Sequence, residues 1–215
     1  MDTYDKILFE ESGDGYTISS KNKTIEGELI IPSFFSNRIV TSIKRKGFEK
    51  CEYITSVIIY ARLDTIAERA FAGCCSLKRI IVPSTVKEIK YAGICIFNYT
   101  SNLAPPQTCD VIFEENSQLE YVNEYGISHG NIRIFFCEQV NTTLNFNAYG
   151  IGIISVHSPH SFKFNGTLQS TYINYCYPRI YPEDEKSTKC TKDNLIEFNS
   201  FYTFLFFISY ILINF

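Results

Sequence analysis

Apolar and small residues recur along the first half of the chain with a step of 23 residues. The step links four sets of positions: Ile43, Ile66 and Ile89; Val40, Leu63 and Val86; Gly47, Ala70 and Gly93; Phe48, Phe71 and Ile94. A period of this length is typical of a solenoid, because one rung cannot bury its own apolar face and must stack on a neighbour. The pattern therefore predicts a stack of similar rungs.

The clearest rung, residues 74–89, predicts two short strands in each repeat. Ile80 and Val82 alternate inward in the first strand, and Pro83 ends it because proline has no backbone N–H to donate. Residues 86–89 form the second strand and face the same core. Each rung should therefore contribute one strand to each of two parallel sheets.

Six segments follow from this pattern. They are an N-terminal hairpin cap (1–24), the repeats (25–97), a loop with a decayed repeat (98–138), an irregular β region (139–182), a polar spacer (183–197) and an apolar, membrane-prone tail (198–215). The first rung has extra residues, which we expect to bulge out as a loop around Phe34 to Asn37. Residues 139–182 contain no match to the 23-residue step, so the array should hold about four rungs.

The rung Cys-x-x-Leu-x-x-Ile-x-Val-Pro-x-x-Val-x-x-Ile at residues 74–89, together with Ala-Phe-Ala-Gly-Cys at 70–74, resembles the BspA-like leucine-rich-repeat family of bacterial and protozoan surface proteins. The resemblance covers roughly residues 25–137 and is specific between 39 and 97. It implies a β-rich leucine-rich-repeat solenoid that serves adhesion or protein binding at a cell surface, without catalytic residues. Ile94 and Phe97 depart from the Phe and Cys that the family usually has at these positions.

One face of the first strands should point away from the core and offer side chains to a partner. The candidate binding residues on this face are Ser56, Ile58, Tyr60, Arg79 and Ile81. Aromatic residues and arginine dominate binding energies at protein interfaces, which favours a protein or another surface macromolecule as the partner. The alternative is that Ile58 and Ile81 only cover neighbouring rungs.

Composition and charge exclude nucleic acid as the expected partner. The chain is 45% hydrophobic, enough to bury a core, and its 20 basic and 23 acidic residues give a net charge of -3. A nucleic-acid-binding surface would need a basic face to neutralise phosphates. The many Tyr, Phe and Ile residues favour strands over helices.

No constellation of residues supports catalysis, a metal or a cofactor. His157 and His160 have the spacing H-x-x-H, but a metal site needs three or four ligands and Pro159 separates the pair in an expected loop. His129 has no recognisable nucleophile or carboxylate partner, and Asp110 with its acidic neighbours fits a solvated face. The chain is therefore expected to be no enzyme.

Eight cysteines leave the redox compartment open. Cys51 and Cys74 stand one repeat apart, which predicts small buried thiols in a repeated slot. The remaining cysteines could pair if the chain is secreted.

The location of the protein depends on its two ends and on its sequons. The start lacks the pattern of a signal peptide, so the chain either avoids that route or has lost its true start. Four N-glycosylation sequons, most of which chance explains, occur at Asn22, Asn98, Asn141 and Asn165.

The tail at 198–215 has several possible roles. It is 18 residues long, which lies at the short end for a transmembrane helix. A lipid-anchor signal, a truncated membrane span, or a terminal element packed on the solenoid are the alternatives. We expect membrane association, with display at the cell surface. The lysines at 186, 189 and 192 favour the other topology, a tail-anchored scaffold on the cytoplasmic face.

Overall fold

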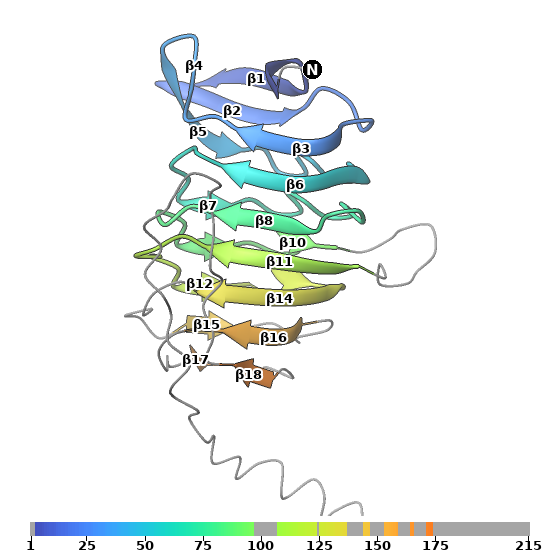
Figure 1. Ribbon diagram of the computed structural model, residues 1–215. Helices are drawn as coiled ribbons and strands as arrows, with labels where there is room; N and C mark the ends of the chain where they lie inside the picture. The colour runs from blue at the N-terminus through green and yellow to red at the C-terminus, as the bar shows by residue number, and fades with distance from the viewer. Residues whose placement is uncertain are drawn as a thin grey trace, which may run out of the picture.

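Parallel strands stack on one another from the N-terminal end of the molecule to the last described strand (Figure 1). The computed structural model describes residues 3–96, 107–123, 125–136, 144–146, 153–158, 164–165 and 171–173. It is a strand-rich parallel β-solenoid of about five turns with almost no helix. The predicted fold class is therefore confirmed.

The longer of the two main sheets has seven strands in the order β18-β16-β14-β11-β8-β6-β3, and every neighbouring pair is parallel. Its strands are β3 (Glu26–Ile31), β6 (Tyr53–Ile59), β8 (Arg79–Val82), β11 (Thr108–Phe113), β14 (Asn131–Phe136), β16 (Ile153–His157) and β18 (Thr171–Ile173). The first strand of each rung thus lies directly on that of the next rung.

The second main sheet contains the short second strand of each rung. Its five strands are parallel and follow the order β17-β15-β12-β9-β7. They are β7 (Thr65–Ile66), β9 (Glu88–Ile89), β12 (Tyr121–Val122), β15 (Leu144–Phe146) and β17 (Phe164–Asn165). A separate two-stranded sheet pairs β10 (Ile94–Cys95) with β13 (Ile127–Ser128).

Turns form a third side of the stack, and backbone hydrogen bonds join them from rung to rung. The amide of Phe48 donates to the carbonyl of Ala70 at 2.8 Å, and that of Phe71 donates to Gly93 at 2.9 Å. The amide of Ile94 continues the ladder to the next turn. The 23-residue step therefore keeps backbone donors and acceptors in register as well as apolar side chains.

The turn geometry explains why each rung keeps a glycine or alanine before its aromatic position. Lys46, Arg69 and Ala92 stand one repeat apart and all have left-handed φ angles, of 61°, 54° and 52°. In each turn the next residue is the small one, which is Gly47, Ala70 or Gly93. A Cβ atom added to Gly47 would lie 2.9 Å from Cγ2 of Ile43, which is too close for an ordinary contact.

A cap with a mixed sheet covers the N-terminal end of the solenoid. It consists of η1 (Thr3–Asp5), β1 (Ile7–Ser12), β2 (Gly15–Ser20), β4 (Phe34–Phe35) and β5 (Arg38–Ile43), with the sheet order β1-β2-β5-β4. In this sheet β1–β2 and β4–β5 pair antiparallel, and β2–β5 pair parallel. The Lys6 ammonium donates to the carbonyls of Glu26 and Glu28 at 2.9 and 3.1 Å. These carbonyls belong to the edge strand β3, so the lysine occupies acceptors that another strand would otherwise use.

The prediction of a loop around Phe34 to Asn37 is wrong. Phe34 and Phe35 form strand β4, which pairs antiparallel with β5. Ser36 and Asn37 form the turn between them, with φ angles of 47° and 64°. The extra residues therefore build a hairpin, because two adjacent left-handed residues produce the tight turn that matches the twist of paired strands.

The solenoid continues beyond the part with a regular sequence repeat. β16 pairs with β14 after a register shift between Ile132 and Arg133, and β18 pairs with β16. Backbone pairing needs only extended chain, so it persists where the side-chain repeat does not. The spacer and the apolar tail lie outside the described residues. In the described part of the chain, no helix has the length and apolarity to cross a membrane.

In the described residues a large apolar core runs through the stack, and Ala72, Ala92 and Cys95 form a small separate cluster. The repeated positions are all buried: Val40, Ile43, Phe48, Leu63, Ile66, Ala70, Phe71, Val86, Ile89 and Ile94. The Phe48 and Phe71 rings stack with centroids 5.5 Å apart and planes at 8°. Each ring therefore covers the aromatic position of the adjacent rung.

Replacing Phe71 with alanine should lower the free energy of unfolding by about 3 to 5 kcal/mol, because it removes a fully buried ring and leaves a cavity against Phe48. Urea denaturation of the full chain measures the loss. Tyr53→Ala is the control, since its side chain is exposed and its removal should change stability by less than about 0.5 kcal/mol. A loss below about 1 kcal/mol for Phe71→Ala would mean that the ring does not support the stack.

Candidate binding surface

Two rows of side chains run along the outer face of the seven-stranded sheet. Side chains alternate across a strand, and Val57, Ile80, Val111 and Ile134 point into the core. Their neighbours in sequence therefore point outward. Strand register aligns them into a polar row and an apolar row: Ser56, Arg79, Asp110 and Arg133; Ile58, Ile81, Ile112 and Phe135.

The predicted binding residues differ in how much of each side chain is exposed. Ile58 and Ile81 are only 9% and 0% exposed, so neither offers side-chain surface to a partner. Tyr60 follows β6 and is 47% exposed, while Ser56 and Arg79 are partly exposed. The Ser56 hydroxyl oxygen itself is buried, so the accessible part of the predicted set is Tyr60 and Arg79.

An ion pair extends the polar row by two residues that sequence reasoning did not include among the binding residues. Arg133 donates through Nε and a terminal nitrogen to the two Asp110 carboxylate oxygens, at 2.7 and 2.8 Å. Asp110 is only 7% exposed, so its expected place on a solvated face is wrong. Arg133 and Asp110 stand 23 residues apart, and this step could have identified the pair. Two parallel hydrogen bonds hold the guanidinium in a fixed plane.

The Arg133 guanidinium also contacts an aromatic cluster. Its guanidinium carbon lies 5.6 Å from the centroid of the Phe135 ring. That ring stacks on His157 with centroids 4.3 Å apart and planes at 16°. Burial lowers the pKa of His157, and the Arg133 charge lowers it further, which favours the neutral imidazole. His157 therefore serves as a packing surface in this cluster.

The structure shows no metal site in the ranges it describes. No group of three or more His, Cys, Asp or Glu side chains converges within those ranges. His157 is packed on Phe135, and His160, the other histidine of the H-x-x-H spacing, lies outside the described residues.

A cysteine and a histidine meet where β10 and β13 pair, a contact that the sequence did not reveal. The Cys95 Sγ lies 3.5 Å from the Nδ1 of His129, and the Ser128 hydroxyl lies 2.8 Å from the same nitrogen. That hydroxyl donates its proton to the Tyr125 carbonyl, also at 2.8 Å. With the hydroxyl proton assigned to that carbonyl, Nδ1–H is the donor to Ser128, and in this tautomer Nδ1 cannot take a proton from the thiol.

Electrostatics agree with an unreactive thiol at this contact. Burial raises the pKa of the Cys95 thiol and lowers the pKa of the His129 imidazole. Both shifts favour the neutral forms, whereas a cysteine nucleophile needs a thiolate stabilised by a cationic neighbour. The pair therefore lacks the charge state that nucleophilic chemistry requires.

The repeated cysteine slot is confirmed. Cys51 and Cys74 are fully buried free thiols, and Cys75, Cys95 and Cys109 are also unpaired. Burial raises the pKa of the Cys74 thiol well above its usual value. These thiols act as small apolar side chains.

One of the four sequon asparagines has a described side chain. The Asn22 side-chain oxygen accepts hydrogen bonds from the Thr24 amide at 3.0 Å and from the Thr24 hydroxyl at 2.9 Å. Asn22 is exposed in the turn between β2 and β3. Asn98 and Asn141 lie outside the described residues. For Asn165, only the backbone in β17 is described.

A solenoid of stacked two-strand rungs with an ordered outer face is a repeat scaffold, a class that includes the leucine-rich-repeat proteins. The family model for the BspA type leucine rich repeat region matches residues 21–151 in six copies. The chain therefore belongs to the BspA-type leucine-rich-repeat family, which suggests a protein-binding or adhesion repeat module. No curated protein and no solved structure matches the chain.

Alkylation with iodoacetamide at about pH 7.5 should leave Cys51, Cys74, Cys95 and Cys109 largely unmodified in the folded chain, because burial keeps them protonated and shielded. Cys75 is less buried and should react first among the described cysteines. Peptide mass spectrometry gives the rate at each site, and urea-unfolded chain provides the reference.

The informative control is His129→Asn, which retains a residue that tolerates the left-handed φ of 59° at this position. This variant should not slow the alkylation of Cys95. If Cys95 instead reacts in the folded chain as fast as in urea, and loses that rate in His129→Asn, the histidine activates the thiol.

Proposed function

We propose that the chain is a non-catalytic recognition module whose contact surface is the outer face of the seven-stranded sheet. The observation that carries the proposal is the polar row that crosses four consecutive rungs in strict register, Ser56, Arg79, Asp110 and Arg133. Repeated rungs fix the spacing of these side chains, because each strand is hydrogen-bonded on both edges. A partner meets a rigid surface, which reduces the ordering cost of binding.

The residue types on this face suit a protein partner. Tyr60 is 47% exposed beside the row, and the Arg133 side chain is 41% exposed. Tyrosine and arginine are enriched among the residues that contribute most to interface energies. The Asp110 carboxylate already neutralises Arg133, so Arg79 is the residue of the row from which we expect the strongest attraction to a partner's acidic group.

Two arrangements support a binding role over a chemical one. In the tautomer assigned from the hydrogen bonds around His129, Nδ1 carries a proton and cannot act as the base for Cys95. The Asp110 carboxylate has both oxygens occupied by Arg133 and is nearly buried. The groups that resemble a nucleophile or a base are thus engaged in structural contacts.

Display at the cell surface, with the apolar segment 198–215 as the membrane attachment, is the second part of the proposal. The segment is 18 residues long, close to the length of a membrane-spanning helix. Family members are often associated with the surface. The competing arrangement is a scaffold on the cytoplasmic face that is anchored by the same tail.

A photo-crosslinking amino acid tests the contact surface when it is placed at Tyr60 or Arg79 of the full chain in the cells that express it. Both positions should capture the same partner, because they lie on one face. Glu88 is the control position, since its strand β9 belongs to the other main sheet. The captured partner is then purified, and Arg79→Ala should weaken its binding about fivefold or more.

Capture from Glu88 but from neither Tyr60 nor Arg79 would place the contact on another side of the solenoid. An unchanged Kd for Arg79→Ala would remove the polar row from the interface.

Glycosylation of Asn22 tests which side of the membrane carries the repeats. If the repeats face the lumen and then the cell exterior, the exposed Asn22 should carry a glycan, because its side chain already contacts the Thr24 hydroxyl of the same sequon. A mass shift after treatment with a peptide N-glycosidase detects the glycan, and Asn22→Gln should abolish the part of the shift that comes from this site. Complete absence of glycan from the chain would contradict surface display and favour the cytoplasmic scaffold.

A further inference from the structure

The hairpin inserted in the first rung presents an exposed aromatic ring at the N-terminal end. Phe34 is 60% exposed, and its cross-strand neighbour Ile39 is 45% exposed. Large apolar side chains gathered at one surface are typical of a binding site. This hairpin belongs to the cap sheet, whereas the polar row belongs to the strands of the seven-stranded sheet (Figure 1).

The turn of this hairpin keeps polar side chains where glycine would be the least costly residue. Ser36 and Asn37 both adopt left-handed φ angles, 47° and 64°. Asparagine tolerates this conformation, whereas serine adopts it at a cost of about 1 kcal/mol or more. The strained backbone thus adds a hydroxyl and an amide to the surface pocket that Phe34 also lines.

Stacked rings hold the base of the hairpin in place. Phe35 stacks on Phe9 with centroids 3.8 Å apart and planes at 8°. Tyr16 meets the Phe35 ring edge-on at 5.3 Å, and Tyr4 lies 5.8 Å from it. Because Phe35 is anchored in this way, Phe34 and the turn have a fixed support.

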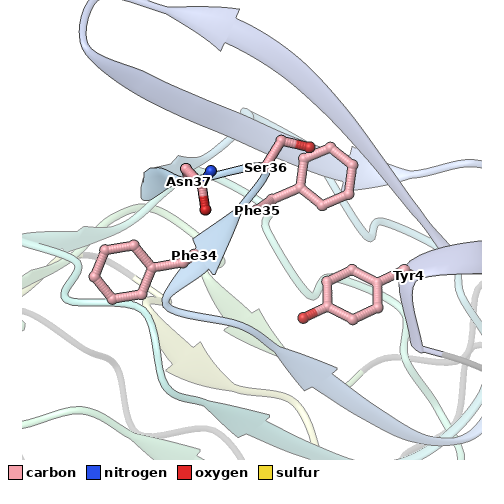
Figure 2. A pocket seen from close by; sticks show the side chains of 5 residues that line it. All are labelled: Tyr4, Phe34, Phe35, Ser36 and Asn37. Atoms are coloured by element: carbon pink, nitrogen blue, oxygen red, sulfur yellow. The ribbon is translucent and has the colours of Figure 1, made fainter.

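These residues border an open surface pocket of about 550 Å³, lined by Tyr4, Phe34, Phe35, Ser36 and Asn37. Figure 2 shows Phe34 and Tyr4 on opposite sides of strand β4, with the Tyr4 hydroxyl directed toward that strand. The volume falls within the range of small-ligand sites, which combine apolar walls with a few polar groups. The polar groups here are two hydroxyls and one amide.

The lining carries no charged residue, and the nearest guanidinium is already engaged. Arg38 follows the turn and pairs with Glu11 at 3.2 Å, while it donates to the Gly13 carbonyl at 2.6 Å. It also lies over the Tyr16 ring at 5.2 Å. A charged ligand would therefore find no opposite charge free in the pocket.

We propose that this pocket binds a neutral saccharide. A pyranose ring has one face of C–H groups, which can pack on the exposed face of Phe34, and an edge of hydroxyls. Those hydroxyls can both donate to and accept from the Asn37 amide and the Ser36 hydroxyl. An extended peptide fits less well, because strand pairing needs a free edge and β4 offers only two residues.

Saturation-transfer NMR on the full chain tests the proposal with cellotetraose, chitotetraose, mannotetraose and lactose, and titration calorimetry then gives the Kd of any sugar that binds. Phe34→Ala should weaken binding about tenfold or more through loss of the stacking surface. Asn37→Gly should weaken it by a similar factor, because glycine keeps the left-handed turn and removes only the amide. Neither change touches the buried core, so thermal unfolding should be unchanged.

Arg79→Ala is the matched control on the other surface and should leave saccharide binding unchanged, which separates this site from the proposed protein-binding face. Failure of every neutral sugar to bind would overturn the proposal. So would binding that survives both hairpin variants, preferential binding of a charged heparin tetrasaccharide, or binding of a proline-rich peptide in place of the sugars.

Discussion

Lateral stacking of rungs is the constraint on which the rest of the structure depends. No rung buries its apolar residues alone, and each one also leaves backbone donors and acceptors unpaired until a neighbour is added. The chain meets both needs with one spacing. The Phe48 and Phe71 rings lie against each other, and the amide of Phe48 donates to the carbonyl of Ala70 in the next rung. Residues that interrupt this spacing must therefore lie outside the stack or at its end.

Stacking also creates the outer surfaces. Because neighbouring strands are parallel and in register, a side chain that points outward in one rung lies beside the equivalent side chain of the next. The Asp110–Arg133 ion pair follows directly from this geometry, since the two residues occupy the same position in adjacent strands.

The N-terminal end of the stack has different requirements. There Lys6 occupies carbonyls of the edge strand β3, and the cap sheet closes over the first rung.

The sequence predicts the core of this fold well and its outer details poorly. Every residue of the 23-residue step that we expected to be apolar and stacked is buried, because burial in a repeat is a local, periodic property. Ile58 and Ile81 were expected to be accessible on the outward face, yet both are buried. Alternation along a strand predicts the direction of a side chain but not whether other residues cover it. The hairpin at Phe34 was expected to be a loop, since its turn contains no glycine to signal left-handed residues. The contact between Cys95 and His129 joins residues 34 positions apart, across an insertion that breaks the regular step, so no spacing in the sequence identifies it.

Hydrogen exchange of the turn amides tests the central claim that neighbouring rungs stabilise one another as a single unit. The amides of Phe48, Phe71 and Ile94 each donate to the following rung and lie in three successive turns. If stacking makes the array cooperative, these three amides should be among the slowest to exchange and should share one opening free energy, equal to that of global unfolding. Exchange at Phe48 that is faster than at Ile94 by more than about tenfold would show that the rungs open independently, and would contradict the account.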